Sequence, residues 1–195
     1  MKKLPVLLCT VLPLIAGAPS VDKGKAFGNP AAPITIELFS DFQCPACQAL
    51  HRDLLPSIMR DYVVPGKAYL VYKEFPLPMH NHSREAAAYA CAAARVGKYE
   101  QVADVLFQNQ SSWAASGKVF ETVSTALSPA EQKKVQTLAK DPAVLNEVQE
   151  DVQEGQSIPV NQTPTMIIIH GAKRYPIAGG LNYNLLRTFL DQMLK

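Results

Sequence analysis

The stretch Glu37–Cys47, Glu-Leu-Phe-Ser-Asp-Phe-Gln-Cys-Pro-Ala-Cys, decides how the rest of the chain is interpreted. An apolar β-prone run, Ile34–Phe39, leads into a Cys-x-x-Cys pair, and a stretch with helical periodicity follows the pair. This order predicts Cys44 at a helix N-terminus and Cys47 one turn further in, with Pro45 at the first helical position, where no N–H is needed. The backbone N–H groups and the positive end of the helix dipole favour a thiolate there. A disulfide at this place is easily reduced and can be passed on to another protein.

The first twenty residues have the composition of a signal peptide. Lys2 and Lys3 form a basic start, Leu4–Ala18 is apolar, and small residues at 16–18 suit cleavage. The apolar run has 15 residues, fewer than the roughly 20 that a transmembrane helix needs, and an uncleaved anchor is the alternative. We therefore expect residues 1–20 to direct export to the periplasm or another extracytoplasmic location.

Charge and cysteine content bear on which partners and which cellular compartment the sequence indicates. Two of the 19 Lys and Arg residues lie in the expected signal peptide, which leaves as many basic as acidic residues, since Asp and Glu number 17. This balance, without a basic patch, gives no indication of nucleic-acid binding. The expected mature chain keeps Cys44, Cys47 and Cys91. We interpret Cys91 as a buried packing residue and the other two as a pair, and export together with Cys-x-x-Cys indicates an oxidising compartment. The alternative for Cys91 is a regulatory or intermolecular thiol.

The periodicity predicts an α/β chain interrupted by helices. A helix from Cys44 to about residue 61, kinked at Pro56, and a strand at Ala68–Phe75 complete a β-α-β unit with a parallel strand pair. Helical patterns follow, and Ser128-Pro129-Ala130-Glu131 is a capping box with proline at the first position.

Strand patterns resume near the C-terminus, at 166–170 and 173–177, and an amphipathic helix over Asn182–Leu194 closes the chain. We expect four parts: a signal peptide at 1–20, a first sheet part with the Cys-x-x-Cys site at 21–77, a helical insertion at 78–157, and a second sheet part at 158–195.

Three features together resemble the DsbA-like branch of the thioredoxin superfamily. They are the sequence Phe-Ser-Asp-Phe-Gln-Cys-Pro-Ala-Cys at 39–47, a helical insertion after the second strand, and Thr-Pro-Thr at 163–165 before an apolar strand. The resemblance covers residues 22–195. It implies an α/β thioredoxin fold with an inserted all-helical domain, and thiol–disulfide exchange in the bacterial periplasm or cell envelope.

The resemblance also implies roles for five residues. Cys44 matches the exposed nucleophile and Cys47 the buried resolving cysteine. Pro164 matches the cis-proline that faces the disulfide, and Thr163 the residue that tunes redox behaviour and substrate release. The backbone of Thr163 would pair with an extended substrate. Glu37 resembles the buried acid that accepts a proton from Cys47, although it lies seven residues before Cys44, one more than is usual in the family.

The implied activity is protein dithiol oxidation without a bound cofactor, because the disulfide itself accepts the electrons. The resemblance implies unfolded or partly folded protein substrates and re-oxidation by a membrane protein of the DsbB or vitamin K epoxide reductase type. We expect a monomer that binds no nucleic acid. The residues between the cysteines, Pro45-Ala46, differ from the Gly-Pro of reducing thioredoxins but also lack the histidine of the best-known oxidases. A disulfide isomerase or reductase, kept reduced by a membrane donor, is therefore the alternative.

A non-catalytic metallochaperone or holdase is the alternative from another class. A zinc site would need two ligands besides the cysteine pair, and His80 and His82 are the nearest candidates. We interpret both as loop residues. His51 is expected on the helix surface, adding little to the local positive field, and Trp113 is expected to pack within the helical insertion.

Overall fold

The computed structural model describes residues 23–158, 160–180 and 182–195. The expected signal peptide lies outside these ranges. Within them, every helix is too short or too polar to span a bilayer.

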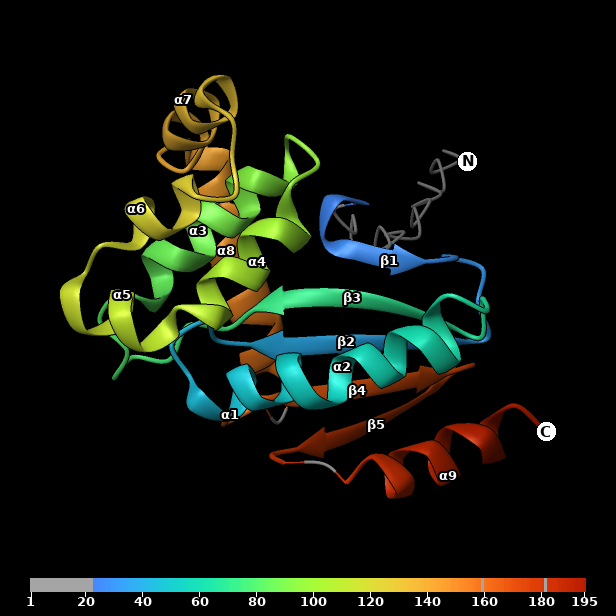
Figure 1. The fold of residues 1–195 in the computed structure, drawn as a ribbon. Coiled ribbons are helices and arrows are strands. Elements are labelled where there is room, and N and C mark those ends of the chain that lie inside the picture. The colour runs from blue at the N-terminus through green and yellow to red at the C-terminus, as the bar shows by residue number, and fades with distance from the viewer. Residues whose placement is uncertain (1–22, 159, 181) are drawn as a thin grey trace, which may run out of the picture.

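In the described part of the chain, five strands form one mixed sheet in the order β1-β3-β2-β4-β5 (Figure 1). β2 and β3 are parallel, as the β-α-β pattern predicts, and the other neighbouring strands are antiparallel. β2, which leads to the cysteine pair, lies at the centre of the sheet. The strands are β1 Ala26–Gly28, β2 Ile34–Ser40, β3 Ala68–Glu74, β4 Thr165–His170 and β5 Lys173–Ala178.

One helical segment follows β2 and alternates between α and π geometry without a break. Pro56 has no N–H to donate to the preceding turn, and the N–H of Leu55 before it bonds to the carbonyl of Leu50, five residues back. We expected Pro56 to kink the helix, and the structure shows π-helical turns on either side of it. The parts of this segment are α1 Pro45–Ala49, η2 Leu50–Leu54, α2 Leu55–Ile58 and η3 Met59–Val63.

A block of helices connects β3 to β4, as predicted. The capping box forms as predicted, since Ser128 Oγ accepts from the Glu131 N–H and the Glu131 carboxylate accepts from the Ser128 N–H. The helices of the block are α3 Ser83–Ala94, α4 Tyr99–Gln108, α5 Gln110–Ser116, α6 Val119–Ser124, α7 Pro129–Leu138 and α8 Pro142–Ser157, and α9 Tyr183–Met193 closes the chain.

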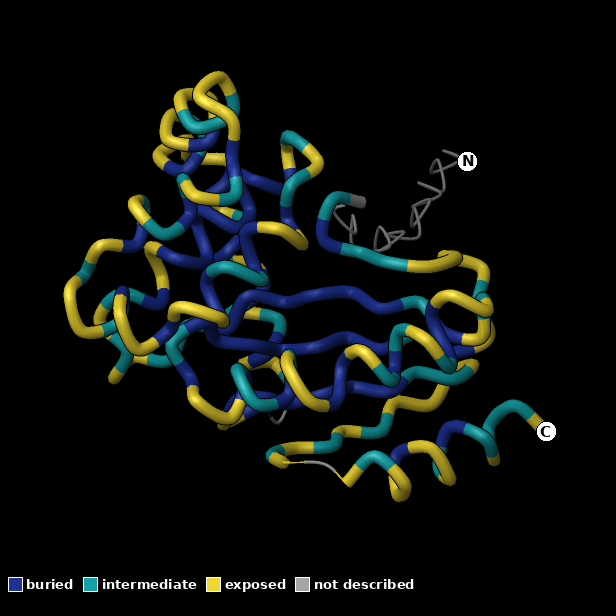
Figure 2. Tube along the Cα trace, viewed as in Figure 1, coloured by how far each residue is buried: buried dark blue, intermediate teal, exposed yellow. Residues whose placement is uncertain are grey.

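Helices cover both faces of the sheet, and β2 and β3 are buried between them (Figures 1 and 2). Leu38 of β2 points to the core that contains Cys47 and the helical segment at 45–63. Phe39 points to the other face, where it packs edge-on against Phe75. Gly155 of α8 lies against these two rings so closely that a Cβ atom would come within 2.5 Å of Phe75. The last helix of the block therefore also covers the sheet, and the division into domains at 78 and 158 stays a prediction.

Charged side chains are buried between α8 and the sheet. Lys25 Nζ lies 2.6 Å from Glu147 and 2.7 Å from Asp151, and Lys73 Nζ lies 2.8 Å from Glu154. The three acids are spaced three and four residues apart, so they lie on one face of α8. This face packs toward the sheet, where Lys25 and Lys73 pair with the acids. Buried charges are tolerated when they are paired in this way.

Candidate active site

Cys44 ends the loop after β2 and caps α1, and Pro45 is the first helical residue, as predicted. The Cys44 carbonyl accepts hydrogen bonds from the N–H groups of Cys47 and Gln48, both at 3.1 Å, which fixes the first turn of the helix. Cys44 is 7% exposed and Cys47 is 1% exposed, and both are free thiols. An incoming thiol therefore reaches Cys44 first.

The two thiols have opposite electrostatic surroundings. A hydrogen bond from the Cys47 thiol is the main cause that lowers the pKa of Cys44 from 9.0 to about 5, and Thr163 and the backbone N–H groups of Cys47 and Ala46 contribute further. Burial, followed by the contact with Cys44, raises the pKa of Cys47 well above its ordinary value. At neutral pH the pair thus holds a thiolate at Cys44 and a thiol at Cys47.

The loop before β4 completes the site. The Thr163–Pro164 peptide bond is cis, as predicted. It brings the carbonyl of Thr163 to 3.4 Å from the Cys44 sulfur, and the protonated Cys44 thiol donates to it. The Thr163 hydroxyl is buried without a hydrogen-bond partner. Thr163 nevertheless contributes to the lowered pKa of Cys44, after the larger effect of Cys47.

Asp41 fixes the loop that carries Cys44. Its backbone N–H donates to the Cys47 sulfur at 3.5 Å. No role for Asp41 was predicted from the sequence, and the signal that could have indicated one is an acid between Phe39 and Phe42, just after the apolar strand run. Its carboxylate is fully buried and contacts four partners: the N–H groups of Gln43 and Leu77 at 2.7 Å, His80 Nδ1 at 2.7 Å and Ser83 Oγ at 2.5 Å.

The helical block supplies a second support that sequence reasoning missed. Gln110 of α5 is buried and donates from Nε2 to the carbonyls of Phe42, at 2.7 Å, and Cys44, at 3.0 Å. Gln48, one residue beyond Cys47, donates to the carbonyl of Phe107 in α4 at 2.6 Å. The active-site turn is therefore held from β2 on one side and from the helical block on the other.

The structure does not bring Glu37 to the other four candidate site residues. Side chains alternate along a strand, so Glu37 shares the face of Phe39, whereas Leu38 faces the core that contains Cys47. Glu37 instead accepts a hydrogen bond from Arg174 of β5 at 2.6 Å. Burial raises the pKa of Glu37, and Arg174 opposes that change. Its role as proton acceptor for Cys47 stays a prediction that no contact in the described residues supports.

The histidines considered from the sequence lie apart from the thiols. His80 contacts Asp41, and the His82 backbone N–H donates to Gln43 Oε1 at 3.0 Å. In the ranges that the structure describes, no three His, Cys, Asp or Glu side chains are grouped in a way that holds a metal ion. The expectation of an exposed His51 is wrong, because its ring is largely buried, stacks on Phe107 and lies 2.7 Å from Asp104.

The two remaining residues behave as packing residues. Trp113 is buried in the helical block and donates to the carbonyl of Leu106 at 2.7 Å. Cys91 is completely buried, and its sulfur lies 3.6 Å from Lys25 Nζ.

The arrangement is suited to exchange between a thiolate and a disulfide. It offers one stabilised, reachable sulfur, one buried partner sulfur, and a cis-proline loop beside the first. These features define the class of protein as a thiol–disulfide oxidoreductase built on a thioredoxin fold.

Comparison with known proteins agrees with this class. The chain matches the family model described as thioredoxin over residues 20–191. It is 22% identical over 163 residues to disulfide bond formation protein D of Bacillus subtilis, which covers 79% of this chain and 71% of that protein. A double cysteine-to-alanine variant of alpha-DsbA1 from Wolbachia pipientis superposes with a TM-score of 0.74 at 21% identity, covering 87% of this chain and 89% of that one. Oxidised BdbD from Bacillus subtilis gives 0.69 at 22% identity, with 88% and 94% covered.

The chain belongs to the thioredoxin family, and within it the chain is a DsbA-like thiol–disulfide oxidoreductase.

Proposed function

We propose that this chain is an exported dithiol oxidase, which transfers the Cys44–Cys47 disulfide to cysteine pairs of unfolded or partly folded envelope proteins. The observation that carries the proposal is the hydrogen bonding that lowers the pKa of Cys44 to about 5. A stabilised Cys44 thiolate leaves readily from a disulfide and makes the reduced pair favourable. A pair that favours its reduced form oxidises other thiols.

The size of the pKa decrease at Cys44 also indicates that electrons flow from substrates to the cysteine pair. A nucleophile pKa of about 7 accompanies a potential of about −270 mV in thioredoxin, and a pKa of about 3.5 accompanies about −120 mV in DsbA. Linear interpolation to a pKa of about 5 gives about −180 mV for Cys44–Cys47. Structural disulfides of secreted proteins lie below about −300 mV, so their formation by this pair is favourable by more than about a thousandfold.

The proposed exchange has two steps. A substrate thiolate attacks Cys44 of the oxidised pair, a mixed disulfide forms, and Cys47 is released and takes up a proton, as its raised pKa requires. The second thiolate of the substrate then attacks the substrate sulfur of the mixed disulfide and releases the Cys44 thiolate. Two electrons pass from the substrate to the cysteine pair. An extended substrate segment pairs with the backbone of Thr163 beside the cis-Pro164.

Turnover requires re-oxidation of the reduced pair. A membrane protein of the DsbB or vitamin K epoxide reductase type is the proposed partner, and the family resemblance supports it. Export is proposed from Lys2, Lys3 and the apolar run at 4–18, which have the composition of a signal peptide.

Oxidative refolding of a reduced protein with known disulfides tests the proposal. The oxidised chain should introduce about one disulfide per molecule when no other oxidant is present, and Cys44→Ser should introduce none. If the reduced chain instead accelerated rearrangement of scrambled disulfides while the oxidised chain formed none, an isomerase would replace the oxidase. Suppression of substrate aggregation by Cys44→Ser at the wild-type level, with no oxidation by either protein, would indicate a holdase.

A further inference from the structure

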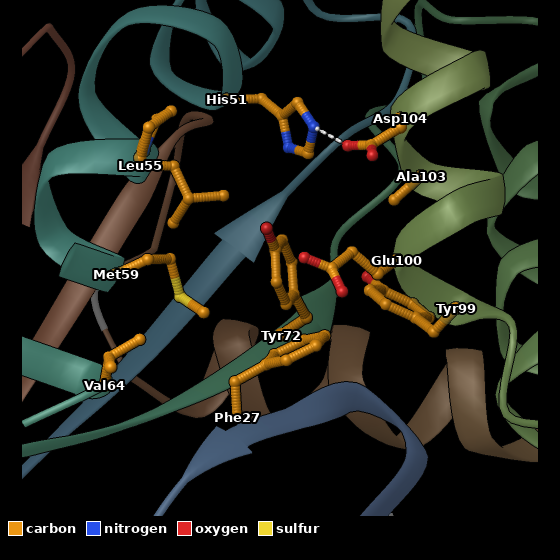
Figure 3. A pocket seen from close by; sticks show the side chains of 11 residues that line it. Phe27, His51, Leu55, Met59, Val64, Tyr72, Tyr99, Glu100, Ala103 and Asp104 are labelled. Carbon is orange, nitrogen blue, oxygen red and sulfur yellow. Dashed lines mark hydrogen bonds and ion pairs between the residues drawn. The ribbon is translucent and has the colours of Figure 1, made fainter. Parts of the chain in front are cut away.

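A pocket of about 380 Å³ opens between the helical segment at 45–63 and α4, and neither active-site cysteine lines it (Figure 3). Its size suits a small ligand or one long side chain. The floor comes from β1 and β3, and the walls come from the helices. Its apolar lining includes Phe27, Leu55, Met59, Tyr72, Tyr99 and Ala103.

The hydroxyl group of Tyr72 points into this pocket without a partner. Tyr72 is 5% exposed, and among the described residues its hydroxyl has no hydrogen bond. Figure 3 shows the hydroxyl directed between the side chains of His51 and Glu100. Burial, with the nearby charges of Asp104 and Glu100, raises the pKa of Tyr72. The hydroxyl therefore keeps its proton and is free to donate or accept.

His51 presents a second unpartnered polar group to the same space. Its Nε2 lies 2.7 Å from Asp104 Oδ1, and its Nδ1 is buried with no hydrogen-bond partner. In the neutral imidazole the proton lies on Nε2, because the Asp104 carboxylate can only accept, and this tautomer makes Nδ1 an acceptor. Buried polar atoms without a partner are uncommon in proteins, and each calls for an explanation such as a ligand.

The charged side chains that line the pocket, Glu100 and Asp104, are both acidic. Glu100 has no hydrogen bond or ion pair among the described residues, and Asp104 contacts only His51. Among the residues that the structure describes, no Lys or Arg lines the pocket. The polar lining thus consists of acceptors and negative charge, and the rings of Phe27 and Tyr72 add aromatic faces, which attract cations.

We propose that this pocket binds an organic cation, an ammonium or guanidinium group carried on a short apolar chain. The cationic head lies among His51 Nδ1, the Tyr72 hydroxyl and the Glu100 carboxylate, and the apolar chain lies against Leu55 and Met59. Two sources carry this chemistry: a lysine or arginine side chain of a bound polypeptide, and a free amine.

Titration of the isotope-labelled protein with phenethylammonium, followed by NMR, tests the proposal. We expect shifts at the backbone amides of the pocket and a Kd of about 1 mM, typical of a fragment of this size. Phenethyl alcohol, which has the same ring and chain without the charge, should bind at least about tenfold more weakly, because it cannot make a charge-assisted hydrogen bond.

A blocked tripeptide centred on arginine, compared with its glutamine counterpart, distinguishes the two sources of the cation. Tighter binding of the arginine peptide than of phenethylammonium indicates a polypeptide side chain, and the reverse indicates a free amine.

Variants locate the site. Glu100→Gln should weaken phenethylammonium binding about tenfold, and Tyr72→Phe about fivefold, since a bond to a charged group contributes more than a neutral one. Glu85→Gln, at an exposed acid of α3, is the matched control and should leave the Kd unchanged. Unchanged backbone amide shifts outside the pocket show that all three variants fold. The proposal is overturned if the alcohol binds as tightly as the ammonium ion, if Glu100→Gln and Tyr72→Phe leave the Kd unchanged, or if no probe shifts the pocket amides.

Discussion

Replacing the resolving cysteine by two different residues tests the origin of the Cys44 thiolate. The hydrogen bond from Cys47 is the largest cause of the lowered pKa of Cys44. Cys47→Ala removes this donor, whereas Cys47→Ser keeps an O–H donor in nearly the same place. A hydrogen bond to a charged group contributes about 1.5–3 kcal/mol, and about 1.4 kcal/mol corresponds to one pKa unit. We therefore expect the pKa of Cys44 to rise from about 5 to about 6–7 in Cys47→Ala and to stay within about one unit of the wild type in Cys47→Ser.

The rate of alkylation by iodoacetamide as a function of pH measures this pKa, since the thiolate is the reactive form. A Cys91→Ala background removes the only other thiol of the described residues. The reasoning is refuted if both variants give the same pKa as the wild type, because the hydrogen bond from Cys47 would then contribute nothing to the thiolate.

Three further predictions concern the supports of the site. Asp41→Ala leaves four donors without an acceptor and should cost about 3 kcal/mol or more in urea unfolding, and an unchanged midpoint would contradict its supporting role. Gln110→Leu should cost about 1–2 kcal/mol but shift the pKa of Cys44 by less than about one unit, because Gln110 contacts carbonyls and not the sulfur. A larger shift in the alkylation profile would show a direct effect on the thiolate. The pKa of Cys44 is lowered on folding, so the thiolate stabilises the reduced protein at high pH, and this gain is lost as pH falls toward 5. The stability of the reduced over the oxidised form should therefore rise by about 1.4 kcal/mol per pH unit between about pH 5.5 and 8, and equal slopes for both forms in urea unfolding would contradict this.

Local patterns predicted the elements that build the site. The apolar run before the cysteines is β2, the proline after Cys44 begins α1, and the capping box at Ser128 begins α7. Each of these depends on residues a few positions apart, where period and capping chemistry act directly. The cis bond at Pro164 came from the family resemblance and not from periodicity.

The supports of the site depend on contacts between distant parts of the chain, which periodicity does not reveal. Gln110 reaches the carbonyl of Cys44 across 66 positions, and Ser83 reaches Asp41 across 42. The position of Glu37 was open to prediction from strand alternation, because an acid seven residues before Cys44 shares a face with Phe39. The role of Glu37 as proton acceptor came from the family resemblance, and the spacing of seven residues to Cys44 was its one departure from the family pattern.

The reduction potential of Cys44–Cys47 tests the central claim most directly. Equilibration with glutathione buffers, trapping of free thiols by alkylation and separation by mass give the fraction oxidised at each ratio. We predict about −180 mV, from the pKa of about 5 for Cys44. A value near the ~−270 mV of thioredoxin, or below it, would contradict the account. The fold and the cysteine pair would stand, but electrons would flow from this protein to its substrates.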